Sequence, residues 1–452
     1  MSIAIVVFLL VLGSLLFHFL SPWYFTPIAS NWIAMDHTIS LTFWVTGAVF
    51  VLVNLFMVYC VIRYRHRKGS KADYEPESKK LEGWLVGLTT VGVAAMLAPG
   101  LAVWADFVHV PENAAVVEAV GQQWYWSYRF PGKDGTLGVS NVRHITDKNP
   151  FGIDPEDPHG KDDILVRGRD LHLPIGKTVK LLLRSKDVLH DFTVAQMRVK
   201  MDLVPGTVSY VWFTPTRTGN FDVLCEELCG IAHFAMRGRM IVEDEPTYQA
   251  WLGTQPTFAE TMMRTAGDPG AGKALYTVCA TCHGAQAEGN PALHAPRLAG
   301  VDAWYLQRQL KNFKTGVRGT HEKDVFGKTM APMAATLVDD AAIANVSAYI
   351  KTLAGKPASA TVTGDANDGK GPYTSNCAAC HGLDGQGQES LHAPPLRGMS
   401  DWYLVTQLNN FKHGIRGDHP KDMFGPQMAL MSKMLKSDEA VNDVVSYVNT
   451  LQ

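Results

Sequence analysis

The sequence predicts a multidomain membrane protein: a transmembrane α-hairpin with an extra N-terminal helix, then an all-β domain, then two all-α units. Three observations support this fold class. Long apolar runs are confined to residues 1–105, short alternating runs punctuated by Gly and Pro fill residues 114–243, and an ungapped internal repeat occupies most of the remainder. At 452 residues the chain is also too long for a single domain.

Charge and cysteine content narrow the function classes. A formal net charge of −2 argues against a nucleic-acid-binding protein, which would present a basic surface. Of the seven cysteines, six fall in the motifs described below, and Cys60 stands alone in an apolar run. No pair is left over for a structural disulfide, so the cysteines point to cofactors.

Three apolar runs predict membrane helices. They are Ile3–Leu20, Leu41–Ile62 and Gly83–Trp104, and the second is long enough to cross a bilayer core of about 30 Å. The first run lacks a basic leading region and a clear cleavage site, so we favour a retained membrane helix in residues 1–30 over a signal sequence. The helix hairpin takes residues 38–106.

The loop of this hairpin carries the densest basic cluster of the chain, Arg63–Lys68. The positive-inside rule places that loop in the cytoplasm, so everything after residue 105 lies on the periplasmic face. We therefore expect a multi-pass protein of the bacterial inner (plasma) membrane.

Residues 112–245 are predicted to form the all-β domain. Apolar and polar residues alternate in Val179–Arg184 and in Val208–Phe213, which is typical of half-buried strands. Pro131–Lys161 is rich in Gly, Asp, Pro and Asn, which predicts an extended loop between strands.

A set of soft metal ligands stands near the end of this domain, at Cys225, Cys229, His233 and Met236. Thiolate, thioether and imidazole together select copper or zinc over magnesium or calcium. A disulfide loop would account for the cysteines alone, and a structural zinc site prefers four strong ligands, so copper is favoured. A copper pair needs a second imidazole, for which His190 is the candidate.

These two segments together resemble the dinuclear copper (CuA) domain of cytochrome c oxidase subunit II, in the haem-copper oxidase superfamily. The resemblance implies a cupredoxin-like Greek-key sandwich in which two coppers share both thiolates. The ligands that it implies are His190, Cys225, the backbone carbonyl of Glu227, Cys229, His233 and Met236.

The same resemblance implies roles for three further groups. Trp124 lies over the copper site in this family and is where electrons enter, although an aromatic strand residue also suits a packing role. Glu82, at the cytoplasmic mouth of the third apolar run, either helps to admit protons or is a surface carboxylate. The carboxylate of Glu227 would help to bind magnesium at the interface with subunit I.

After a predicted polar linker over residues 244–272, the chain repeats with an offset of 98 residues, from Cys279 to Cys377. Both copies contain Cys-x-x-Cys-His, the c-type haem attachment motif, in which two thiols bond the haem and the histidine binds iron. A thioredoxin-like motif or a zinc knuckle could produce one such pentapeptide, but duplication in register favours haem. The implied haem-binding residues are Cys279, Cys282, His283, Cys377, Cys380 and His381.

The two repeats, residues 266–355 and 364–452, resemble class I cytochromes c in a diheme arrangement. Each repeat offers two methionines, three residues apart, as the distal iron ligand, and one of each pair suits packing. The resemblance favours the first, which selects Met330 over Met333 in one repeat. The distal ligands implied are therefore Met330 and Met428.

Other features also recur in register. The last helices, expected at Asp340–Leu353 and Asp438–Leu451, are amphipathic and should pack on the first helix of each repeat. His294 and His392 are expected near a haem edge or its propionates.

Together the resemblances imply subunit II of a terminal cytochrome c oxidase, with two cytochrome c domains fused to its C-terminal side. Electrons would pass from a periplasmic cytochrome c, or a quinol:cytochrome c oxidoreducing complex, through two c haems and CuA to haem a of subunit I. Oxygen reduction there is coupled to proton pumping, and subunit III is a further partner. Chain order predicts the electron path second haem, first haem, copper. The alternative is the electron-input subunit of a CuA-containing nitric oxide reductase.

Overall fold

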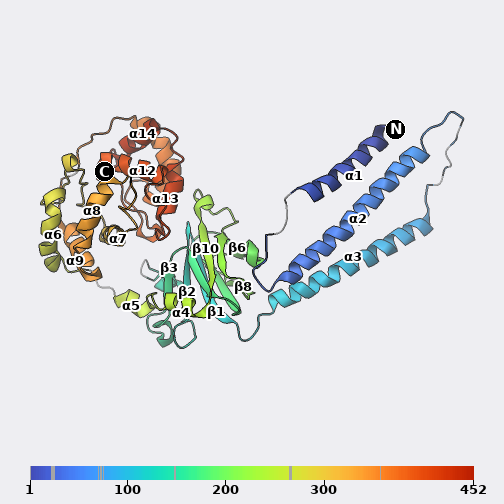
Figure 1. The fold of residues 1–452 in the computed structure, drawn as a ribbon, viewed down its shortest axis with the longest axis horizontal. Coiled ribbons are helices and arrows are strands. Elements are labelled where there is room, and N and C mark those ends of the chain that lie inside the picture. The colour runs from blue at the N-terminus through green and yellow to red at the C-terminus, as the bar shows by residue number, and fades with distance from the viewer. Residues whose placement is uncertain are drawn as a thin grey trace.

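The computed structural model describes residues 2–21, 26–69, 71, 74, 76–146, 149–263, 267–356 and 358–451. Three long helices come first, then a two-sheet sandwich, then a helical region (Figure 1). The predicted boundaries at residues 1, 266 and 452 lie outside the described residues.

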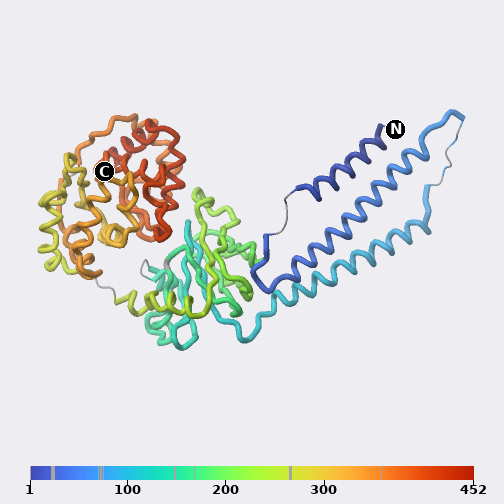
Figure 2. The backbone as a smooth tube through the Cα atoms, viewed as in Figure 1, coloured from blue at the N-terminus to red at the C-terminus, as the bar shows by residue number. Residues whose placement is uncertain are grey.

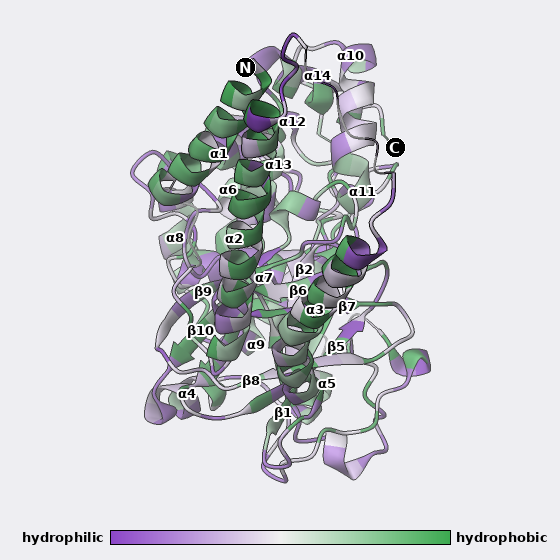
Figure 3. Cartoon of the chain, turned by 90° about the vertical axis from the view of Figure 1, so that its right-hand side faces the viewer, coloured by the Kyte–Doolittle hydropathy of each residue, from purple (hydrophilic) through white to green (hydrophobic). Residues whose placement is uncertain are grey.

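The N-terminal part consists of α1 (Ser2–Leu20), α2 (Ile33–Arg63) and α3 (Lys79–Val108). All three are long and apolar enough to cross a membrane, and Figure 3 shows mostly hydrophobic residues along them. Apolar side chains point outward, which suits contact with lipid rather than water. Helix α1 packs against α2, as Figure 2 also shows. The three predicted apolar helices are thus confirmed.

The helix hairpin is fixed to the sandwich by hydrogen bonds at its periplasmic end. The indole N–H of Trp32 donates to the Trp212 carbonyl (2.9 Å), and the indole N–H of Trp212 donates to the Phe107 carbonyl (2.8 Å). Arg198 pairs with Asp36 of α2 at 2.6 Å. The all-β domain is therefore held directly on the membrane anchor.

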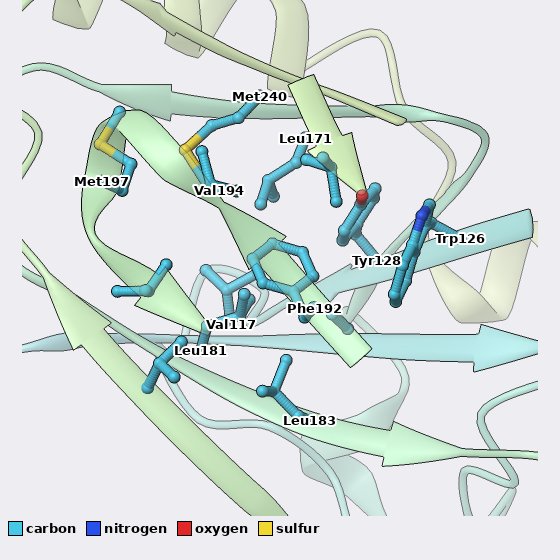
Figure 4. Packing of buried hydrophobic residues seen from close by; sticks show 14 of the residues in the cluster. Val117, Trp126, Tyr128, Leu171, Leu181, Leu183, Phe192, Val194, Met197 and Met240 are labelled. Carbon is cyan, nitrogen blue, oxygen red and sulfur yellow. The ribbon is translucent and has the colours of Figure 1, made fainter. Parts of the chain in front are cut away.

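The sandwich consists of two five-stranded sheets, with strand orders β3-β2-β1-β5-β8 and β4-β10-β9-β6-β7. Trp126, Tyr128 and Phe192 are among the fully buried side chains between them (Figure 4). The strands are β1 (Ala115–Gln122), β2 (Tyr125–Phe130), β3 (Ile164–Arg167), β4 (Asp170–Pro174), β5 (Val179–Ser185), β6 (His190–Val194), β7 (Val199–Leu203), β8 (Ser209–Phe213), β9 (Gly219–Leu224) and β10 (Arg237–Glu243). The cupredoxin-like sandwich, both predicted strands and the long loop between β2 and β3 are confirmed.

The repeat forms two helical units with matching elements, which we call the first helical unit (267–355) and the second helical unit (364–451). The first contains α6 (Pro269–His283), α7 (Ala303–Lys314), α8 (Val325–Ala335) and α9 (Asp340–Thr352). The second contains α10 (Ala366–Pro372), α11 (Ala378–His381), α12 (Asp401–Lys412), α13 (Gly425–Ser432) and α14 (Asp438–Val448). The last helix packs on the first helix in both units, as predicted.

The linker prediction was wrong over most of residues 244–272. This segment contains α4 (Glu245–Leu252) and α5 (Phe258–Met263), and α6 starts inside it. Helix α4 packs on the sandwich because Trp251 stacks on His172 (ring centroids 4.0 Å apart) and lies edge-on to Phe130. Composition alone missed this packing, since the aromatic residues stand among polar ones.

Replacement of Trp251 by Ala should destabilise the sandwich by about 2 kcal/mol, because a half-buried aromatic side chain leaves a gap against β2 and β4. The loss is measured as a lower melting temperature of the β-domain transition. Val139→Ala, at a side chain 64% exposed, is the control and should melt like the parent. Equal melting of both variants would mean that α4 is not bound to the sandwich.

Candidate metal and haem sites

The predicted copper ligands come together in the loop between β9 and β10. The Cys225 sulfur lies 3.8 Å from the Cys229 sulfur and 3.3 Å from the Glu227 carbonyl oxygen. The Cys229 sulfur lies 3.4 Å from Nδ1 of His233 and 3.8 Å from the sulfur of Met236. Four donor side chains and one carbonyl therefore converge from a single loop.

His190 completes this cluster from the start of β6. Its Nδ1 lies 3.9 Å from the Cys225 sulfur, and its Nε2–H donates to Asp187 (2.8 Å). Asp187 also accepts a hydrogen bond from the backbone N–H of Gln123 (2.8 Å). Metal-binding histidines commonly donate their other ring N–H in this way, which fixes the tautomer that faces the metal.

The two thiols share their protons unequally. The hydrogen bond between the sulfurs lowers the pKa of Cys225 to about 3, while the same contact raises the pKa of Cys229 well above its usual value. The pair therefore loses one proton readily and holds the other, which a bound metal would displace.

This donor set fits copper. His190, Cys229 and Met236 are almost fully buried, and sulfur with imidazole is the ligand chemistry that copper favours. His190, Cys225 and Cys229 place one donor atom each within 4.8 Å of one another.

Trp124 lies between the copper loop and the second helical unit. Its indole N–H donates to the Cys229 carbonyl (3.1 Å), and only 5% of the residue is exposed. Its own carbonyl accepts a hydrogen bond from the side-chain amide of Gln427, on α13. The resemblance also gave roles to two carboxylates. Glu82 is exposed in the first turn of α3, and Glu227 is half-buried.

Each helical unit encloses a cavity that contains its predicted haem-binding residues. The first cavity is lined by Cys279, Cys282, His283, Met330 and Met333, and the second by Cys377, Cys380, His381, Met428 and Met431. Both methionines of each pair face the cavity, so the choice of Met330 and Met428 stays a prediction.

Each of the two cavity histidines has one ring nitrogen held by a backbone carbonyl, an arrangement that would suit an iron ligand. Nδ1 of His283 donates to the Pro296 carbonyl and Nδ1 of His381 to the Pro394 carbonyl, both at 2.8 Å. This leaves Nε2 unprotonated for a metal. Burial lowers the pKa of both imidazoles, which keeps them neutral.

A polar cluster separates the two cavities. Arg318 donates to the side-chain oxygens of Gln309 and Gln407, both at 2.9 Å. Arg416, its counterpart in the repeat, donates to the same two amides at 2.8 and 2.7 Å. Five side chains line both cavities: Tyr305, Gln309, Met399, Tyr403 and Gln407.

The guanidinium groups at this boundary fit acidic cofactors. Nε of Arg318 and Nη1 of Arg308 are buried and have no hydrogen-bond partner among the described residues. In the same part of the chain, no ion pair involves Arg308, Arg318 or Arg416. Buried cations need a counter-charge, which the two propionates of a haem would supply.

Sequence reasoning missed several of these residues. Asp187 precedes a ligand histidine by three residues, which was the available signal. Arg318 and Arg416 recur in register as Gly-x-Arg-Gly, but nothing local indicates what they face. Gln427 has no counterpart amide in the first repeat, where Thr329 stands.

Comparison with known proteins supports the prediction of a copper-binding β-domain followed by two cytochrome c domains. The family model described as "Cytochrome C oxidase subunit II, periplasmic domain" matches residues 115–243, and the model "Cytochrome c" matches residues 270–354 and 366–452. The "Alternative cytochrome c oxidase subunit 2" of Bradyrhizobium diazoefficiens is 59% identical over 266 residues, which cover 59% of this chain and 96% of that protein. The chain belongs to the cytochrome c oxidase subunit II family.

Two further relatives match different parts of the chain. The "Cytochrome c oxidase subunit 2" of Cereibacter sphaeroides is 28% identical over 219 residues, 46% of this chain and 71% of that protein. The "Thiosulfate dehydrogenase electron acceptor" of Stutzerimonas stutzeri is 37% identical over 182 residues, 37% of this chain and 76% of that protein.

Membership of the subunit II family settles the general role. This chain is an electron-transfer component of an oxidoreductase complex, a haem-copper oxidase with a subunit I. Its domains imply copper and haem c, and its apolar helices anchor periplasmic domains at a membrane. The Bradyrhizobium diazoefficiens and Cereibacter sphaeroides relatives both carry cytochrome c oxidase names, so the nitric oxide reductase alternative is not favoured.

The helical unit that lies nearer to the copper loop is not the one that was predicted. Chain order placed the first unit nearer to copper, but the second unit contacts the copper domain. The Ser390 carbonyl accepts hydrogen bonds from Gln122 (2.8 Å) and from the Tyr125 hydroxyl (2.9 Å). Trp124 and Ala232, on the copper domain, line the second cavity. The folded segment with α4 and α5 carries the first unit away from the copper loop, which chain order could not show (Figure 1).

Removal of the Asp187 carboxylate should weaken copper binding by about 10–100-fold, because His190 loses the acceptor that orients its ring. Copper retention by Asp187→Ala is measured by competition with a chelator. Asp222→Ala removes an exposed carboxylate from β9 and should retain copper like the parent. Unchanged retention in Asp187→Ala would show that Asp187 does not orient the ligand.

Proposed function

We propose that this chain is the subunit through which electrons enter a terminal cytochrome c oxidase. It takes electrons from a periplasmic cytochrome c, or from a quinol:cytochrome c oxidoreducing complex, and delivers them to haem a of subunit I. Oxygen reduction there is coupled to proton pumping, and subunit III completes the complex. The chain crosses the bacterial inner membrane several times. The observation that carries this proposal is the convergence of all six predicted copper donors beside the cavity of the second helical unit.

The proposed cofactors are one dinuclear CuA centre and two covalent c haems. The copper donors are His190, Cys225, the Glu227 carbonyl, Cys229, His233 and Met236. Cys279, Cys282, His283 and Met330 would hold one haem, and Cys377, Cys380, His381 and Met428 the other. When bound, these groups accept and release single electrons, and buried soft ligands keep the geometry constant as they do so.

Electrons would enter at the first helical unit, continue into the second, and reach the copper loop beside Trp124. Three contacts support this order. The cavities of the two units share Tyr305, Gln309, Tyr403 and Gln407. Gln427 of the second unit donates to the carbonyl of Trp124, whose indole in turn binds the Cys229 carbonyl.

Subunit I would contact the outer face of the copper loop. Leu228, Ile231 and Phe234 expose 82%, 37% and 48% of their surface there, which is unusual for a loop in water. Magnesium at this interface would take the carboxylate of Glu227 as one ligand. Glu82, exposed at the opposite end of α3, would help to admit protons to subunit I.

Replacement of Cys225 by Ser tests the cofactor proposal. The purified parent complex should contain two coppers and two haems per chain, a near-infrared mixed-valence copper band and a-type haem from its partner. Cys225→Ser should lose the copper and its band but keep both c haems, because the haem-binding cysteines lie elsewhere. Cys60→Ser, which changes the cysteine of α2, should keep everything. Zinc in place of copper, or porphyrin extracted by acid acetone, would contradict the proposal.

The position of Trp124 on the path from the c haems to copper is tested by Trp124→Phe. Loss of the indole N–H should slow electron delivery to copper without slowing reduction of the c haems, because it removes the hydrogen bond to the Cys229 carbonyl. Absorbance at the haem and copper bands is followed by stopped-flow. Trp251→Phe, away from the copper loop, is the matched control. An unchanged rate in Trp124→Phe would remove this residue from the path.

A further inference from the structure

Equivalent surfaces of the two helical units differ in what covers them. In the second unit, the surface around the cavity mouth is covered by the copper domain. The ring of Tyr125 lies edge-on to His392 (5.1 Å between centroids) and to Phe424 (5.9 Å). Cys380 and Met431 pack against the core of the sandwich. This surface is therefore a contact face for another redox domain.

In the first unit, the equivalent surface is more exposed to solvent. Leu293 and Phe326, the counterparts of Leu391 and Phe424, are 54% and 44% exposed, whereas those counterparts are only partly exposed. Cys282 is exposed, whereas its counterpart Cys380 is partly buried. The free surface also includes Val278 (47%) and Val325 (62%). We call Val278, Leu293, Val325 and Phe326 the free apolar face.

The free apolar face carries almost no charge. The segments that form it are 278–283, 290–296 and 325–333, and Lys328 is their one Lys, Arg, Asp or Glu residue. The copper domain presents Gln122, Trp124 and Tyr125 to the second unit, which are also uncharged. This contact therefore joins mainly apolar and amide groups, together with one attraction between Arg169 of the copper domain and Asp422 of the second unit.

We propose that the free apolar face is the docking site of the electron donor. This inference rests on the proposed function, since it identifies where the donor binds. The donor is a soluble redox protein that surrounds its cofactor with a mainly apolar contact surface, like the one that Trp124 and Tyr125 present to the second unit. An exposed apolar patch of this kind at a cavity mouth is typical of a protein-binding site. Because charges contribute little, docking depends weakly on salt.

The test uses the intact oxidase with reduced azurin, a small copper protein with an apolar contact surface, as the donor. Stopped-flow absorbance gives the second-order rate constant for c-haem reduction. Val325→Asp, at a side chain 62% exposed and outside the cavity lining, should lower this constant about tenfold, because docking would bury a charge without a partner. The constant for the parent should change less than about twofold between low and moderate salt. Val338→Asp, at a side chain 83% exposed in the same unit and outside the cavity lining, should behave like the parent.

Oxygen consumption with ascorbate and tetramethylphenylenediamine separates two kinds of failure. This small donor needs no protein docking, so all variants should consume oxygen at the parent rate. Normal consumption with an unchanged azurin rate in Val325→Asp, or a steep salt dependence of the parent, would overturn the docking proposal alone. Loss of small-donor consumption in the parent itself would instead contradict the proposed function.

Discussion

Two buried sulfurs 3.8 Å apart are the constraint on which the rest of this structure depends. Thiols this close cannot both ionise without a compensating cation, and the opposed pKa shifts of Cys225 and Cys229 express that conflict. A loop alone would let them separate. The sandwich prevents this, because β9 and β10 pair on both sides of the loop and β6 brings His190 against it. The site is therefore preformed by the fold.

The contacts around the copper loop also hold it in place. On one side, the Trp32 and Trp212 contacts hold the sandwich on the membrane helices. On another side, Trp124 binds the Cys229 carbonyl and receives Gln427 from the second helical unit. Each of these bonds joins segments that are distant in sequence. The loop is thus fixed relative to both the membrane helices and the second helical unit, which is what short-range transfer of electrons requires.

The sequence predicted which side chains would converge where the candidate ligands are close together in the chain. Cys225 to Met236 lie within one loop, and Cys-x-x-Cys-His lies within one helix end, so spacing alone was informative. Sequence reasoning failed where packing between distant segments determines the structure. Trp251 turns a polar segment into a helix bound to the sandwich, and that segment then displaces the first helical unit from copper. Asp187 was missed although it stands three residues before His190, whereas Arg318 could not be assigned, since its partners include Tyr403 and Gln407 of the other repeat.

Differences between the two repeats explain how one surface serves both a permanent and a transient contact. Gln427 reaches the Trp124 carbonyl, and the Ser390 carbonyl accepts from Gln122 and Tyr125, so the second unit is hydrogen-bonded in place. Thr329 stands where Gln427 would be, and its shorter side chain lacks the amide. The first unit keeps the apolar residues of the surface but not this polar anchor. A contact on the same surface that lacks these hydrogen bonds is weaker and dissociates faster, which suits a partner that must leave after each electron.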